Sequence, residues 1–189
     1  MLTFKSRADR IEIATDDVDA IKIAGKNFVI IDFSGFCYHS GGKALLEEYI
    51  TKNGGVVRKS AVKSTDYAIV CPVAYKYTAN YKKPAEDYLK VLSLKKGGKD
   101  VWVLSDLDFF IYFDLFSKLR VDNKLRVADV YLNGYTGFSD KAAQRIEKFI
   151  KEKQDTYKYK EYFEQPMQSS IEPLYDSDNC TINIDGKQI

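Results

Sequence analysis

One segment limits the possible folds more than any other: residues 27–33, with the sequence NFVIIDF. Successive side chains of a strand point to opposite faces of a sheet, so a strand with one solvated face alternates apolar and polar residues. This run is almost continuously apolar, and Gly25 and Gly35 bound it. Such a strand is typical of a sheet that is covered on both faces, and sheets of that kind are mostly parallel with helices on either side.

Signals for strands and helices alternate after this segment. Asn53-Gly54-Gly55 is a helix stop, Pro84 suits the first turn of a helix, and Ser105 can cap one. Strands are predicted at residues 56–62, 67–71 and 101–104, and helices at residues 43–53, 84–94 and 106–116. The resulting order, βαββαβα, predicts a central parallel four-stranded sheet flanked by helices in three layers, with right-handed crossovers.

The two ends of the chain have a different character, so we expect an α/β domain over residues 23–118. Residues 1–22 are predicted to form an N-terminal β extension, either a hairpin or an extension at the edge of the sheet, in which Thr15-Asp16-Asp17 separates two short runs. Residues 119–189 are predicted to form an α+β appendage. Its expected parts are a strand at 127–132, an amphipathic helix opening at Ser139-Asp140, an extended tail at 165–179 and a short strand at 181–184.

Composition and charge narrow the class of protein. The net charge of +2 requires no nucleic acid partner, and no apolar run approaches the roughly 20 residues that span a bilayer. The N-terminus lacks the apolar stretch of a secretory signal, so a cytoplasmic protein is expected. Cys37, Cys71 and Cys180 are too few and too scattered for a disulfide framework, and Cys37 with His39 supplies too few ligands for a metal. We therefore expect no metal and no cofactor.

Several segments, taken in order, resemble the BRCT family, the phosphoprotein-binding and DNA-end-binding modules of repair and replication proteins. Residues 23–30 (IAGKNFVI) are similar to the family's opening strand, and Ser34-Gly35 stands where the family has a Ser/Thr-Gly pair. The helix ending in Gly54-Gly55, the segment STDYAIV at 64–70 and the segment VLSDLDF at 103–109 resemble the family's later elements. The resemblance implies a BRCT-like fold over about half of the chain, with a degenerate second copy as an open alternative.

The same residues predict a phosphate site. A buried strand that leads through a serine-glycine turn to a helix N-terminus presents backbone N–H groups to an anion, and the Ser34 hydroxyl can donate as well. In phosphate-binding members of the family a lysine at the start of the second helix completes the pocket, which the resemblance carries over to Lys82 or Lys83. The expected phosphate-binding residues are Ser34, Gly35, Lys82 and Lys83. The alternative is that Ser34 only caps a turn.

A second turn of this kind is predicted near the appendage. Tyr135-Thr136-Gly137-Phe138 repeats the pattern of residues 33–36, and each stretch precedes an amphipathic helix. Thr136 and Gly137 are therefore candidates for a second anion turn. The alternative is an unrelated appendage that packs on the first domain.

Motifs that suggest catalysis do not survive inspection. Gly41-Gly42-Lys43 lacks the first glycine and the hydroxyl residue of a phosphate loop, and no catalytic triad can be assembled around the single histidine, His39. The acidic residues Asp106, Asp108 and Asp114 are expected on a solvated helix face. We expect no enzyme activity.

The sequence thus favours a non-catalytic binding module in DNA repair or replication, which recognises a phosphorylated protein segment or a DNA end phosphate. The alternative is a scaffold or dimerisation domain without phosphate binding, in which the apolar third helix contributes to a homodimer. The phenylalanines that this alternative would expose are Phe109, Phe110, Phe113 and Phe116. Neither hypothesis involves a membrane.

Overall fold

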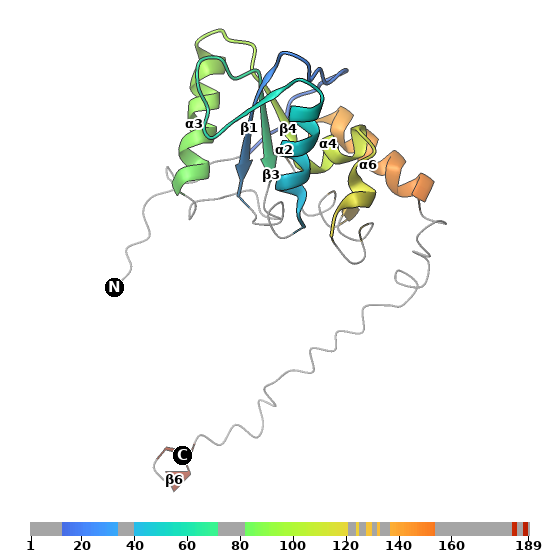
Figure 1. Cartoon of the computed structure of the whole chain (residues 1–189). Coiled ribbons are helices and arrows are strands. Elements are labelled where there is room, and N and C mark those ends of the chain that lie inside the picture. Colours follow the sequence, from blue (N-terminus) through green and yellow to red (C-terminus); the bar gives the residue numbers. More distant parts are fainter. Residues whose placement is uncertain are drawn as a thin grey trace.

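The computed structural model describes residues 13–33, 40–71, 82–120 and 137–153, together with residues 124, 128, 129 and 132 and the pairs 183–184 and 187–188. Its centre is a parallel four-stranded sheet with the strand order β2-β1-β3-β4 (Figure 1). The strands are β1 (Asn27–Asp32), β2 (Val56–Arg58), β3 (Tyr67–Cys71) and β4 (Trp102–Ser105). The predicted α/β architecture with a central parallel sheet is confirmed.

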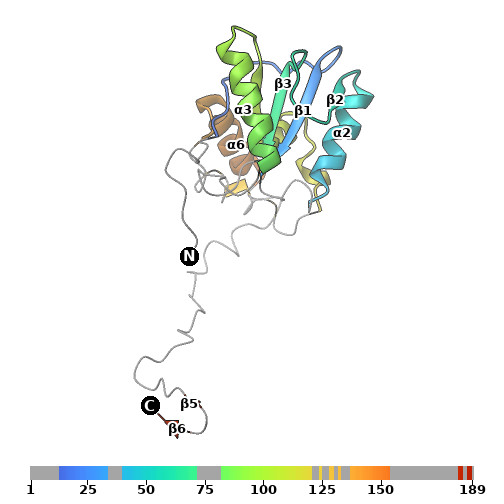
Figure 2. The same cartoon turned by 90° about the vertical axis from the view of Figure 1, so that its left-hand side faces the viewer.

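Helices cover both faces of this sheet. Figures 1 and 2 show α3 (Lys82–Lys96) on one face, and α2 (Gly42–Lys52), α4 (Asp106–Tyr112) and α6 (Asp140–Lys153) on the other. Each face has its own apolar cluster: Tyr88 and Val91 of α3 pack with Val29 and Val70, whereas the opposite cluster contains residues from α2, α4 and α6. This two-sided burial explains why all five residues of β3 are buried and why the strands lack polar alternation.

The turn after α2 depends on its two glycines. Gly54 has a φ of +78°, a left-handed conformation that glycine adopts without a Cβ clash. A Cβ on Gly55 would lie 2.7 Å from Cγ2 of Ile50 and 2.9 Å from Cγ2 of Ile23. The pair therefore lets β2 start directly beside α2 and beside the segment that precedes β1.

The predicted N-terminal hairpin is wrong over the part of it that the structure describes. Residues 13–23, which we call the N-terminal strap, contain no strand; they pass the β4 edge of the sheet at Asp16 and reach the turn between α2 and β2 at Ile23. The strap's Asp16 N–H donates to the carbonyl of Val103 at 2.8 Å, and the Val103 N–H donates to the Asp16 carboxylate at 2.7 Å. A side chain thus takes the place of a second ladder bond, while four apolar strap residues are buried: Ile13, Val18, Ile21 and Ile23.

Other predicted elements were displaced or shortened. The strand expected at 127–132 is wrong, because the described residues Ala128, Asp129 and Leu132 are helical. The expected third helix ends at Tyr112 and is followed by a separate 3-10 helix, η2 (Phe116–Lys118); Asp114 between them has a φ of +53°, which interrupts helical geometry. The amphipathic helix opening at Ser139-Asp140 is confirmed as α6, with the Ala142 N–H donating to Ser139 Oγ.

Near the C-terminus, β5 (Asn183–Ile184) pairs with β6 (Lys187–Gln188) in an antiparallel ladder, and β5 overlaps the strand expected at 181–184. The tail expected at 165–179 lies outside the described residues. Among the residues that the structure describes, no helix has the length and apolar character required to cross a bilayer.

Candidate functional site at the carboxyl edge of the sheet

The carboxyl ends of the parallel strands form one edge of the molecule. In register, Asp32 at the end of β1 pairs with Cys71 at the end of β3. The chain passes from β1 through α2 to β2 on one side, whereas β3 and β4 lie on the other side, so the strand order switches direction between β1 and β3. In open parallel sheets, ligands bind outside the carboxyl ends of the strands at such a switch point.

Two of the predicted phosphate-binding residues begin a helix at this edge. Lys82 and Lys83 are the first residues of α3, and a helix N-terminus carries partial positive charge and unbonded N–H groups. Ser34 and Gly35 lie outside the described residues, immediately after Phe33, where β1 leaves the sheet. The fold therefore brings the start of α3 to the edge at which β1 ends, while the side chains of Lys82 and Lys83 are not among those described.

The start of α2 lies at the same edge and has an additional cation beside it. Ser40 Oγ accepts the N–H of Gly42 at 3.2 Å, and the Ser40 carbonyl accepts the N–H of Arg120 at 2.9 Å. The Arg120 side chain covers Gly41: its Cδ lies 3.6 Å from the position that a Cβ on Gly41 would take. Sequence reasoning missed Arg120, and no local pattern reveals it, because it reaches Gly41 only through the fold.

Asp106 lies beneath this edge and is fully buried, so its prediction as part of a solvated helix face is wrong. Its Oδ1 accepts the N–H of Leu107 at 2.8 Å, and its Oδ2 has no hydrogen-bond partner among the described residues. The pKa of Asp106 is raised to about 7, chiefly by burial and to a smaller extent by the nearby Asp32 carboxyl, while the Leu107 N–H and the Cys71 thiol partly offset the rise. The carboxyl group is therefore poised between its neutral and charged forms near neutral pH.

Asp108 is also buried, but it has a counter-ion. Both of its oxygens accept hydrogen bonds from Arg145 of α6 at 2.7 Å, and the same guanidinium donates to the carbonyl of Val18 in the strap at 3.1 Å. The hydrogen bond to Asp108 raises the pKa of Arg145. This pair joins α4, α6 and the strap, so its role is structural. Of the three aspartates predicted on a solvated face, only Asp114 is exposed.

The phenylalanines of the third helix mostly belong to the core. Phe109, Phe110 and Phe116 are at most 1% exposed, and Phe113 is partly buried against the same cluster. Phe109 forms edge contacts with Phe28 and Tyr49. Homodimerisation stays a prediction, but these three buried rings are not available on the surface for it.

The second predicted anion turn is described only in part. Thr136 lies outside the described residues, and the carbonyl of Gly137 accepts the N–H of Thr15 at 2.8 Å. The Thr15 hydroxyl accepts the N–H of Ser139 at 2.8 Å. These contacts attach the start of α6 to the strap.

The carboxyl edge combines basic residues at the surface, such as Arg120, with the buried carboxyl group of Asp106 beneath them. Within the described parts of the chain, no three histidine, cysteine or acidic side chains gather as metal ligands would. Cys37 and His39 lie outside those parts. Comparisons of the sequence with protein-family models and with curated proteins, and of the fold with solved structures, found no match.

Proposed function

We propose that the chain is a non-catalytic BRCT-like binding module that recognises a phosphate group, carried by a phosphorylated protein segment or by a DNA end, in DNA repair or replication. The observation that carries the proposal is the meeting of the β1 exit with the N-terminus of α3 at the switch point of the sheet. This junction would place Ser34 and Gly35 opposite Lys82 and Lys83.

The layer arrangement supports the resemblance that suggested this function. A BRCT-like module requires a parallel sheet in the middle layer with helices on both faces, and here α3 is the one described helix on its face. The glycine pair that resembles the family's turn lies between α2 and β2, where Gly55 has no space for a side chain. Both features are compatible with the proposed family, and neither is specific to it.

The charges near this edge favour an anionic ligand. Lys82 and Lys83 occupy the positive end of a helix dipole, and Arg120 lies beside the start of α2. A charge-assisted hydrogen bond contributes about 1.5–3 kcal/mol, so the loss of two lysines corresponds to a loss of affinity of at least roughly 100-fold. Asp106 is neutral at acidic pH and charged above about pH 7, where its negative charge would oppose a bound anion.

A titration with paired ligands tests the proposal. The chain is titrated with a phosphopeptide and a 5′-phosphorylated DNA duplex, and with the same ligands lacking phosphate. We expect at least one phosphorylated ligand to bind at least about 100-fold more tightly than its unphosphorylated form, Ser34→Ala to reduce that difference, and the double variant Lys82→Ala/Lys83→Ala to remove most of it.

The matched control is the double variant Lys52→Ala/Lys96→Ala. It removes two lysines from the C-terminal ends of α2 and α3, at the opposite edge of the sheet, and should leave the preference for phosphate unchanged. Equal affinity for the phosphorylated and unphosphorylated ligands would refute phosphate recognition and leave the scaffold alternative.

A further inference from the structure

Among the described residues, no segment pairs with the outer edge of β2, in contrast to the outer edge of β4. In the strand order β2-β1-β3-β4, β2 pairs with β1 on one side and with no described strand on the other. The Val56 N–H donates to the carbonyl of Lys26 and therefore faces β1. Because peptide groups alternate in direction along a strand, the N–H and the carbonyl of Val57 face outward, where an added strand would bond them.

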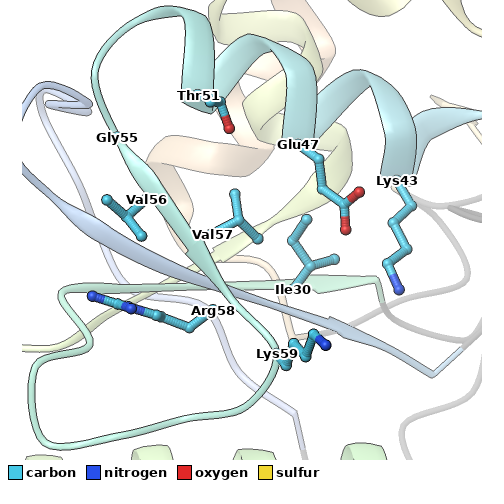
Figure 3. Close-up of a pocket in the computed structure, with 9 residues that line it drawn as sticks. All are labelled: Ile30, Lys43, Glu47, Thr51, Gly55, Val56, Val57, Arg58 and Lys59. Atoms are coloured by element: carbon cyan, nitrogen blue, oxygen red, sulfur yellow. The ribbon is translucent and has the colours of Figure 1, made fainter.

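A groove follows this edge. It lies between α2 and the strands β1 and β2 and has a volume of about 690 Å³, within the range of pockets that hold ligand groups (Figure 3). Figure 3 shows Ile30 and Val57 pointing from the sheet toward α2, which gives the groove an apolar floor. Val56 at the edge is 42% exposed.

The rim of the groove is mainly basic. Lys43 of α2 and Arg58 and Lys59 at the end of β2 are exposed, and Glu47 is the only acidic residue among those that line it. Arg58 donates to the Asn27 side chain, and neither Lys43 nor Lys59 has an ion-pair partner among the described residues. These cations remain available to an acidic ligand.

We propose that this open edge and its groove form a docking surface for an extended, acidic segment of a partner protein, which adds to β2 as a further strand. Main-chain bonds to Val57 supply affinity, apolar side chains on alternate positions enter the groove, and acidic side chains meet the basic rim. A second copy of the chain is a poor occupant, because pairing β2 with β2 would bring Arg58 and Lys59 close to their own equivalents. Charge complementarity therefore favours an acidic partner.

Binding of a designed peptide tests this surface in the full chain. The probe is a fluorescent eight-residue peptide that alternates glutamate and valine and carries no phosphate. Fluorescence anisotropy should give a dissociation constant at or below the millimolar range, and amide NMR shifts should cluster at residues 55–59. The same peptide with lysine in place of glutamate, and the glutamate peptide with alternate backbone nitrogens methylated, should each bind at least about tenfold more weakly.

Two double variants distinguish binding in the groove from a general attraction between the charges of the peptide and the protein. Lys43→Glu/Lys59→Glu should weaken binding by about tenfold or more, whereas Lys96→Glu/Lys151→Glu, with the same change in net charge away from the groove, should stay within about twofold. Lys82→Ala/Lys83→Ala should also retain binding, which distinguishes this surface from the proposed phosphate site. No binding of the glutamate peptide, equal binding of the methylated peptide, or NMR shifts away from β2 would each overturn the proposal.

Discussion

The two outer edges of the sheet differ in how their outward backbone groups are bonded. At the β4 edge the N-terminal strap occupies the backbone groups of Val103, and its Asp16 forms an ion pair with Lys95 of α3 at 2.5 Å. The hydroxyl of Tyr88 accepts the Ala14 N–H at 3.0 Å. At the β2 edge no described residue bonds to the outward groups of Val57, and the neighbouring charged side chains are exposed.

This difference suggests that the β4 edge contributes to the stability of the fold and that the β2 edge contributes to the binding of a partner. An unprotected strand edge invites pairing with another chain, so a chain that covers one edge and leaves the other open restricts pairing to one place. Charges on the sealed side are held in contacts within the protein, as Arg145 with Asp108 shows. On the open side, Lys43 and Lys59 have no ion-pair partner in the described parts of the chain. Substitutions should therefore change folding on one side and binding on the other.

The largest effect on stability should follow from removing the N-terminal strap. A chain that begins at residue 24 loses the burial of four apolar side chains, each of which contributes about 1.5–3 kcal/mol. The expected loss of at least about 6 kcal/mol is comparable to the total stability of a typical domain, 5–15 kcal/mol. We expect the shortened chain to be unfolded or aggregated, as measured by circular dichroism, urea titration and light scattering. A monomer with unchanged urea midpoint would show that the strap does not seal the edge.

The next effect concerns Asp106, which directly follows β4 and has no counter-ion among the described residues. Because its pKa is raised from 3.8 to about 7 in the folded protein, the folded chain retains a proton that the unfolded chain releases between those values. The stabilising contribution is complete below about pH 4 and is lost as the pH rises to about 7. At 1.36 kcal/mol per pKa unit, the loss is on the order of 4 kcal/mol.

The variant Asp106→Asn removes this titration. Its free energy of unfolding relative to the wild type should therefore rise by up to about 4 kcal/mol between pH 4 and pH 8, measured by urea unfolding at each pH. Asp114→Asn, at an exposed position a short distance along the chain, is the control and should show no comparable rise. A difference between Asp106→Asn and wild type that does not vary with pH would contradict a raised pKa.

The sheet could be predicted from the sequence because its signals are local. The apolar run at 27–33 indicates a strand that is buried on both faces, and Gly54-Gly55 indicates a left-handed turn. Each signal depends only on residues that are close together in the sequence. The strap could not be predicted, because its alternating apolar residues have the same period as a strand. What decides its structure is contact with Val103 and Gly137, far along the chain.

The buried aspartates show the same limit at the candidate site. A charged residue on a helix is normally solvated, and Asp108 departs from that rule only because Arg145, 37 residues later in the chain, neutralises it. Asp106 departs from it with no counter-ion in the described parts of the chain, and its burial could be found only from the packing of α4 beneath the strand ends. The positions of Lys82 and Lys83, in contrast, follow from the βαβ order alone, since a helix after β3 must begin at the carboxyl edge.

The smallest effect on stability should come from the open edge. Lys43→Ala/Lys59→Ala removes two exposed charges without ion-pair partners among the described residues, and such surface changes alter the free energy of unfolding by no more than about 0.5 kcal/mol. Asp16→Ala on the sealed side removes one partly buried charge and should cost about 2 kcal/mol, because the Val103 N–H and the Lys95 ammonium lose their acceptor. Urea unfolding of both variants under one condition measures the contrast. Equal losses would mean that the two edges contribute alike to folding, and the distinction between a sealed edge and an open edge would fail.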